Sequence, residues 1–214
     1  MNKYIISLLV SVLCCSCFNH YERPEDLPLN AASKFAPLKP SKWKLENGLE
    51  VQFLKDEELP RVSATLYIPK GTLFVDDQDY ASTVAVGSLM RAGAGDFSAN
   101  ELDLVLNKLS ASVSASIGGE YSTASFSCLS TDLEEVFSIY SDVIFRPRFE
   151  ESRFSLWKSQ AIQGVKRRTD DPQTVASISF SQLLYGKTPY ARLLVESDLQ
   201  KLEREDLYLS LIHI

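Results

Sequence analysis

The sequence is nearly without histidine. Among its 214 residues only His20 and His213 occur, one near each end of the chain. Chemistry that needs an imidazole in the middle of a domain, such as a histidine-ligated metal or a histidine-activated nucleophile, is therefore excluded from residues 21–212.

Positive charge is not in excess either. Lys and Arg number 22 against 28 Asp and Glu, which gives a net charge of −6. Proteins that grip a phosphate backbone carry a broad cationic surface, so we expect no nucleic acid partner. The composition, with 45% hydrophobic and 23% charged residues, is that of an ordinary globular protein and excludes disordered and collagen-like chains.

No apolar run is long enough for a permanent membrane span. The run from Tyr4 to Leu13 follows Met1-Asn2-Lys3 and has about half of the ~20 apolar residues that a spanning helix needs. A short charged stretch followed by such a run is typical of a cleaved export signal, which we place at residues 1–16.

The signal ends in a cysteine-rich string, Leu13-Cys14-Cys15-Ser16-Cys17. It resembles the lipobox of bacterial lipoproteins, in which a small residue precedes the cysteine that is acylated. Cys17 fits best, although cysteines occupy the two positions before Ser16, where an aliphatic and a small residue are usual. We expect Cys17 to be lipidated and the protein to be exported to the cell envelope or periplasm, anchored to a bacterial membrane. A plain secretory signal is the alternative.

Cysteine is scarce once the signal is removed, because only Cys17 and Cys128 remain. No intrachain disulfide is expected if Cys17 carries lipid. Cys128 falls in an alternating strand pattern, so we expect a small buried hydrophobe there and not a nucleophile.

Proline is concentrated ahead of the folded domain. Residues 17–42 hold Pro24, Pro28, Pro37 and Pro40 among polar residues, without a sustained apolar period. This composition predicts an extended tether. The folded domain is expected to span residues 43–208.

Alternation along the chain predicts an antiparallel sheet. Asn47-Gly48 is a turn signal between two short strands, and residues 62–68 alternate as in a half-buried strand. Serine occupies every second position from Ser110 to Ser116, opposite apolar residues, and Gly118-Gly119 turns the chain into a similar return strand. This pair predicts a hairpin with one buried and one polar face.

Capping residues mark the expected helices. Ser98 with Glu101 and Thr131 with Glu134 have capping-box spacing, and Asp171-Pro172 is typical of a helix start. The expected helices span about residues 80–90, 98–109, 131–146, 149–168 and 171–184. Together with the strands they predict an α+β fold, an antiparallel sheet packed by helices.

Several local strings occur in a specific order and spacing: Leu45-Glu46-Asn47-Gly48-Leu49, Phe97 to Leu109 with the serine hairpin, Phe145-Arg146-Pro147-Arg148-Phe149, Thr169-Asp170-Asp171-Pro172, Leu184-Tyr185-Gly186 with Pro189-Tyr190, and Arg204-Glu205-Asp206-Leu207. This series resembles the N-terminal domain of the pitrilysin/insulinase family of zinc peptidases, which includes the mitochondrial processing peptidase. The resemblance covers about residues 45–207 and implies an α+β domain of the LuxS and processing-peptidase type.

Active members of that family carry H-x-x-E-H on the first helix, where two histidines bind zinc and the glutamate activates water. Counting back from the glycine that ends this helix puts Val84 and Ser88 at the histidine positions and Gly87 at the glutamate. The family's third ligand and its supporting glutamate, on the long later helix, fall at Gly164 and Trp157. The resemblance therefore implies no catalytic residue, no metal ligand and no cofactor in this chain, with zinc expected in a partner subunit.

In this family two related halves enclose a peptide chamber, and one half can be inert. By resemblance, we interpret the chain as the inert subunit that helps form the chamber of a zinc-bearing homologous partner, with an extended peptide as substrate. The five replaced positions would line that chamber, and ordinary packing between two helices is the alternative for them. A stand-alone binding or scaffold lipoprotein stays open, and an active metalloendopeptidase with catalytic groups in a missing C-terminal half is the least favoured reading.

The last residues, 209–214, match nothing that the family would show after Leu207. We interpret them as a non-native tail on a truncated reading frame and leave His213 out of any site. A fragment without its closing strands would leave a sheet edge unpaired and is expected to melt with weak cooperativity.

Overall fold

The structure is a computed structural model that describes residues 38–213. The predicted signal, Cys17 and residues 17–37 of the predicted tether lie outside this range. Two compact units, which divide between Asp56 and Glu57, are described separately. Within residues 38–213, no helix combines the length and apolar character that crossing a membrane requires.

The first unit contains the predicted antiparallel hairpin of β1 (Ser41–Lys44) and β2 (Glu50–Phe53). Asn47 Oδ1 accepts the backbone N–H of Leu49 at 3.1 Å, and Gly48 adopts a φ of +90°, which a side chain would strain. The hairpin begins at Ser41, so the tether predicted to reach residue 42 ends earlier. The predicted domain of residues 43–208 is likewise divided between the two units.

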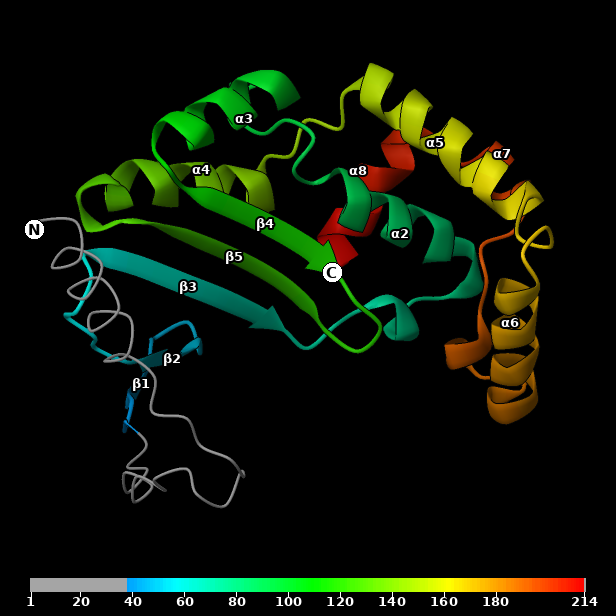
Figure 1. Ribbon diagram of the computed structural model, residues 1–214, viewed down its shortest axis with the longest axis horizontal. Coiled ribbons are helices and arrows are strands. Elements are labelled where there is room, and N and C mark those ends of the chain that lie inside the picture. Colours follow the sequence, from blue (N-terminus) through cyan, green and yellow to red (C-terminus); the bar gives the residue numbers. More distant parts are fainter. Residues whose placement is uncertain (1–37, 214) are drawn as a thin grey trace, which may run out of the picture. The chain divides into compact units, whose positions relative to one another are not determined.

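The second unit is built on a three-stranded antiparallel sheet. In spatial order, its strands are β3 (Arg61–Ile68), β5 (Ser122–Leu129) and β4 (Ser112–Ile117) (Figure 1). Phe126 of the central strand pairs with Ala64 on one side and Val113 on the other. Phe126, Val113 and Cys128 are buried, which confirms the inward face predicted for the serine hairpin.

The opposite face of this sheet is covered mainly by small hydroxyl side chains. This surface, here called the hydroxyl face, consists of Ser63, Thr65, Ser112, Ser114, Ser116, Thr123, Ser125 and Ser127. Three pairs of these hydroxyls are hydrogen-bonded across neighbouring strands at 2.8–3.1 Å. Much of the face therefore satisfies its own hydrogen bonds without help from another element.

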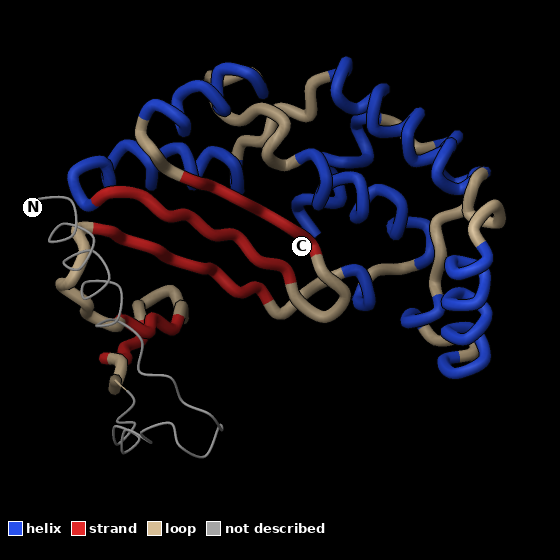
Figure 2. The backbone as a smooth tube through the Cα atoms, in the orientation of Figure 1, coloured by secondary structure: helices blue, strands red, loops and turns tan. Residues whose placement is uncertain are grey.

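Helices follow the strands in the predicted order (Figure 2). The α-helices are α2 (Tyr80–Leu89), α3 (Ala99–Lys108), α4 (Leu133–Phe145), α5 (Glu151–Lys166), α6 (Pro172–Tyr185), α7 (Glu196–Lys201) and α8 (Arg204–His213). Short 3-10 turns are η2 (Thr72–Phe74), η3 (Asp77–Asp79), η4 (Ser130–Asp132) and η5 (Pro189–Ala191).

Two apolar clusters hold this unit together. The first lies between the inner face of the sheet and helices α3 and α4, and includes Leu102, Phe126 and Val136. The second joins α2 to α5 and α8 through Val86, Phe154 and Leu207. Helix α2 thus lies at the contact between the sheet and the later helices, where it also touches β4.

The predicted helix starts are only partly confirmed. Ser98 and Glu101 form the capping box, and Asp171 Oδ2 accepts the N–H of Thr174 at 2.9 Å. The capping box predicted for Thr131 and Glu134 is wrong. Turn η4 runs directly into α4, so that Thr131 already lies in helical backbone and cannot act as its N-cap.

Residues 209–213, predicted to be a non-native tail, form the last turns of α8. Ser210 is buried, and its Oγ lies 3.0 Å from Oγ1 of Thr83 in α2. The described domain therefore continues past residue 208.

Replacing Ser98 by Ala tests the α3 cap. The substitution removes the hydroxyl that accepts the N–H of Glu101, so we expect the free energy of unfolding to fall by about 1 kcal/mol. Denaturant unfolding measures this change. A midpoint and slope equal to those of the wild type would contradict the role of the cap.

The same cap makes stability depend on pH. Hydrogen bonds from the Ser98 side chain and backbone to the carboxylate lower the pKa of Glu101 from its ordinary value of 4.5. A carboxylate whose pKa is lowered by folding stabilises the fold above its unfolded pKa, and this stability is lost as the pH falls through the folded pKa. Glu101→Gln should therefore make stability less sensitive to acid below about pH 4.5. Denaturant unfolding at a series of pH values measures this, and an acid dependence equal to that of the wild type would contradict the role of the carboxylate.

Candidate functional site

The five positions singled out from the sequence lie on α2 and α5, two helices that contact each other. Helix α2 is rich in small residues, of which Ala81, Ser82, Thr83 and Ala85 are buried. It is enclosed by β4, α5 and α8 (Figure 1). Small side chains allow its backbone to approach these neighbours closely.

Gly87, which we predicted to occupy the glutamate position of the motif, packs closely against β4. A Cβ atom placed on Gly87 would lie 3.1 Å from Cβ and 3.2 Å from the backbone N of Ile117. These distances are shorter than the ~3.5–4.0 Å of a favourable carbon contact. Ile117 is paired with Ser122 of β5, so its backbone cannot move freely. A side chain at Gly87 would therefore press on Ile117, which would have to shift by a few tenths of an ångström.

Val84 and Ser88, which we predicted to occupy the two histidine positions, lie one turn apart on α2. Val84 is half-buried and Ser88 is exposed. The Ser88 hydroxyl donates to the carbonyl oxygen of Val84 at 3.0 Å, a bond between a side chain and the preceding turn of its own helix. Neither residue offers the nitrogen donor of a zinc ligand.

Trp157 and Gly164, the positions assigned on α5, have different surroundings. Trp157 is half-buried and packs against the apolar cluster that contains Ala85 and Val86 of α2. Gly164 is exposed, and a Cβ atom placed on it would have no neighbour within 4 Å. The structure thus brings Trp157 to the apolar cluster of α2 and leaves Gly164 open.

No metal-ligating group replaces the motif elsewhere in the part of the chain that the structure describes. Across residues 38–213, no three His, Cys, Asp or Glu side chains gather in a group that could hold a metal ion. Cys128 is buried in β5, and burial, with a smaller effect of the Asp132 charge, raises the pKa of its thiol. A protonated, buried thiol is a poor nucleophile and a poor ligand.

Comparison with known proteins decides the family. The profile described as insulinase (peptidase family M16) matches residues 51–198. The chain belongs to the insulinase family. A comparison with curated protein sequences gives no match.

Solved structures share the fold of this insulinase-family chain. The inactive domain of a peptidase of this family from Pseudomonas fluorescens has a TM-score of 0.73 at 19% identity, over 81% of this chain and 43% of that chain. The periplasmic protease PqqL from Escherichia coli has a TM-score of 0.72 at 16% identity, over 98% of this chain and 24% of that chain. The ferredoxin protease FusC, solved with Arabidopsis ferredoxin, has a TM-score of 0.72 at 17% identity, over 84% of this chain and 20% of that chain.

These likenesses confirm the predicted α+β insulinase-type fold. The chain spans less than half the length of each of the three solved relatives.

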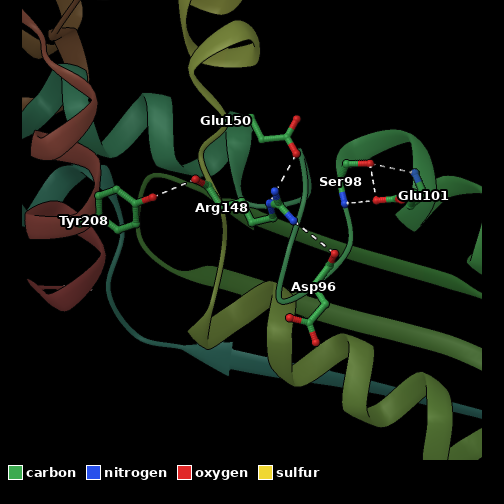
Figure 3. Close-up of polar contacts among 6 residues, drawn as sticks. All are labelled: Asp96, Ser98, Glu101, Arg148, Glu150 and Tyr208. Carbon is green, nitrogen blue, oxygen red and sulfur yellow. Dashed lines mark hydrogen bonds and ion pairs between the residues drawn. The ribbon is translucent and has the colours of Figure 1, made fainter.

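One of the family strings, Phe145 to Phe149, joins α4 to α5 and contacts the loop that follows α2. Arg148 Nη1 donates to the carbonyl oxygen of Asp96 at 3.2 Å, in the loop after α2, and Arg148 Nε lies 3.5 Å from Oε1 of Glu150, just before α5 (Figure 3). Tyr208 of α8 donates its hydroxyl to the carbonyl oxygen of Arg148 at 2.8 Å. We call Asp96, Arg148, Glu150 and Tyr208 the Arg148 junction; it links the loop after α2, the segment before α5, and α8.

The Arg148 junction was not identified from the sequence. Phe149, between Arg148 and Glu150, is fully buried with a φ of +43°, a left-handed conformation that is strained for a bulky residue. The ring of Phe149 packs edge-on against Tyr208, with 5.1 Å between ring centroids. This conformation also explains why α5, predicted from about residue 149, begins at Glu151. The sequence feature that could have indicated this junction is Pro147, which follows the end of α4 and forms a β-bridge with Ala94.

The two helical glycines of the site predict opposite effects of alanine. Gly164→Ala, in open space, should raise the free energy of unfolding by about 0.5–1 kcal/mol, because alanine is the better helix former. Gly87→Ala gains the same propensity but must displace Ile117, an overpacking that costs about 1–3 kcal/mol. Thermal unfolding should show a raised Tm for the first variant and a lowered Tm for the second. An equal rise for both would show that α2 is not closed against β4.

Proposed function

We propose that this chain is a non-catalytic part of an insulinase-family peptidase assembly, in which it helps to enclose the peptide substrate of a zinc-bearing homologous partner. The observation that carries the proposal is Gly87. At the position that we assign to the water-activating glutamate the chain has no carboxylate, and a Cβ atom there would lie 3.1 Å from Cβ of Ile117. Val84 and Ser88 add no ligand, so the helix keeps its place in the fold without its chemistry.

The relatives support a role beside a partner half. One of them is named an inactive domain of a peptidase, and all are longer than this chain. An inert half that keeps the family's fold presents a defined surface even without a zinc site. Such a surface can line a chamber that a partner closes.

A stand-alone binding or scaffold lipoprotein is the second candidate. It is favoured by the same absence of zinc ligands, because a chain without them can act as a binding or scaffold protein with no peptidase partner. The two candidates differ in one respect, since only the chamber role makes a homologous peptidase depend on this chain.

We also propose that the protein is exported and anchored in the cell envelope through lipid on Cys17. The support is the signal pattern of residues 1–16 and the lipobox-like string before Cys17. A relative of the same fold, PqqL, is a periplasmic protease.

The metal content of the purified chain tests the loss of chemistry. We expect substoichiometric zinc by mass spectrometry and no peptide cleavage by the chain alone. The double variant Val84→His with Ser88→His is the positive control, because two histidines one turn apart on a helix can chelate a metal. This variant should gain zinc without gaining cleavage, since Gly87 supplies no base. Stoichiometric zinc together with cleavage by the wild type would overturn the proposal.

Reconstitution tests the partner. A zinc-bearing insulinase-family peptidase from the same cell should bind this chain and cleave peptides faster in its presence. We expect Gly87→Ala to weaken this effect in proportion to its loss of folding, and Gly164→Ala to preserve it. A peptidase whose rate is the same with and without the chain would favour the scaffold role.

Replacement of Cys17 tests the anchor. Cys17→Ser should abolish acylation, seen as a loss of mass, and should release the protein from the membrane fraction. Cys15→Ser is the matched control, because it changes a neighbouring cysteine that we expect to be removed with the signal. Release by Cys15→Ser and not by Cys17→Ser would show that the acylated residue is misassigned.

A further inference from the structure

A cavity of about 770 Å³ opens at one end of the hydroxyl face, outside the region of the replaced zinc positions. Four tyrosines from separate segments line it: Tyr67, Tyr80, Tyr121 and Tyr190. Three of them, Tyr67, Tyr121 and Tyr190, are at least half exposed. We call this cavity the tyrosine pocket.

Two charged side chains, Arg192 and Glu120, line the tyrosine pocket. Arg192 is largely buried and already neutralised, because its Nε lies 2.9 Å from Oδ1 of Asp77. Its Nη1 donates to the carbonyl oxygen of Val75 at 2.9 Å, and its guanidinium lies 5.1 Å from the centre of the Tyr80 ring. The pocket therefore already contains one cation held against a tyrosine ring.

Glu120, at the turn between β4 and β5, has no such compensation. Its Oε1 accepts a hydrogen bond from the Tyr190 hydroxyl at 2.8 Å. Among residues 38–213, no Lys, Arg or His forms an ion pair with it. The hydrogen bond and the negative charge of Glu120 raise the pKa of Tyr190, so the phenol stays protonated and keeps the carboxylate in place.

The tyrosine rings of this region form two aromatic pairs. Tyr67 and Tyr121 lie with their ring centroids 6.0 Å apart, and Tyr190 is stacked on Tyr185 at 5.4 Å. Aromatic faces attract cations, and a carboxylate beside them adds a charge-assisted hydrogen bond.

We propose that the tyrosine pocket binds a basic side chain, lysine or arginine, of an extended peptide that lies along the hydroxyl face. Ser116 and Thr123 belong both to the hydroxyl face and to the lining of the pocket, so a peptide on that face passes its mouth. This assignment rests on the proposed function and adds to it that the hydroxyl face borders the peptide chamber. Glu120 supplies the opposite charge, and the tyrosine rings supply the surface along which the aliphatic part of the side chain lies.

The test compares two labelled peptides on the purified full-length chain. The first is a short peptide of alanine and serine with one central arginine, and the second carries citrulline, which has the same shape without the charge. Fluorescence anisotropy should show that the arginine peptide binds at least about fivefold more tightly, with a difference that shrinks at high salt. A lysine peptide should behave like the arginine peptide.

Glu120→Gln should remove the preference, so that both peptides bind alike, and Tyr121→Ala should weaken the arginine peptide. Glu135→Gln is the control, because it removes an exposed carboxylate on α4 that does not line the pocket. Circular dichroism checks that each variant is folded, which we expect because Glu120 lies on an exposed turn.

Equal affinity of the wild type for the arginine and citrulline peptides would overturn the assignment, as would an unchanged preference in Glu120→Gln or no binding at all. None of these results bears on whether a zinc-bearing partner needs this chain, which the reconstitution measures separately. Conversely, a preserved arginine preference with no effect on any peptidase would support the pocket and contradict the chamber role.

Discussion

The contact between α2 and β4 is the constraint on which the rest of the second unit depends. Because Gly87 has no side chain, the helix lies directly against Ile117, and α5 and α8 can close over its other sides. The buried hydrogen bond between Thr83 and Ser210 is one result of this closure. A side chain at Gly87 would press on Ile117, so the close packing of α2 on β4 and the absence of a carboxylate at this position go together.

Much of the fold could be predicted because its signals are local. The Asn47-Gly48 turn, the alternating serines and the capping pair of Ser98 and Glu101 each act within a few residues. The capping box predicted at Thr131 failed for a local reason, because η4 runs directly into α4. The start of α5 was missed because a distant contact decides it. Phe149 keeps a left-handed backbone because Tyr208, about sixty residues later, covers its ring and bonds the preceding carbonyl. No spacing in the neighbouring sequence encodes that contact.

The sequence predicted the helix of the candidate site but not the surroundings of its residues. Family resemblance assigned Val84, Gly87 and Ser88 to α2, which forms where it was expected. It could not show that Gly87 is closed by a strand while Gly164 stands in open space. The tyrosine pocket is a stronger case, because its rings come from segments as distant as Tyr67 and Tyr190 and only the tertiary fold brings them together.

The hydroxyl face has a property that follows from its uniformity. Serine and threonine repeat along and across the three strands, and many of their hydroxyls already bond one another. A polypeptide shifted along this surface by two residues would meet nearly the same groups as before. The hydroxyl face therefore does little to favour one register of a bound polypeptide over another. Contacts at the ends of the face would have to set that register.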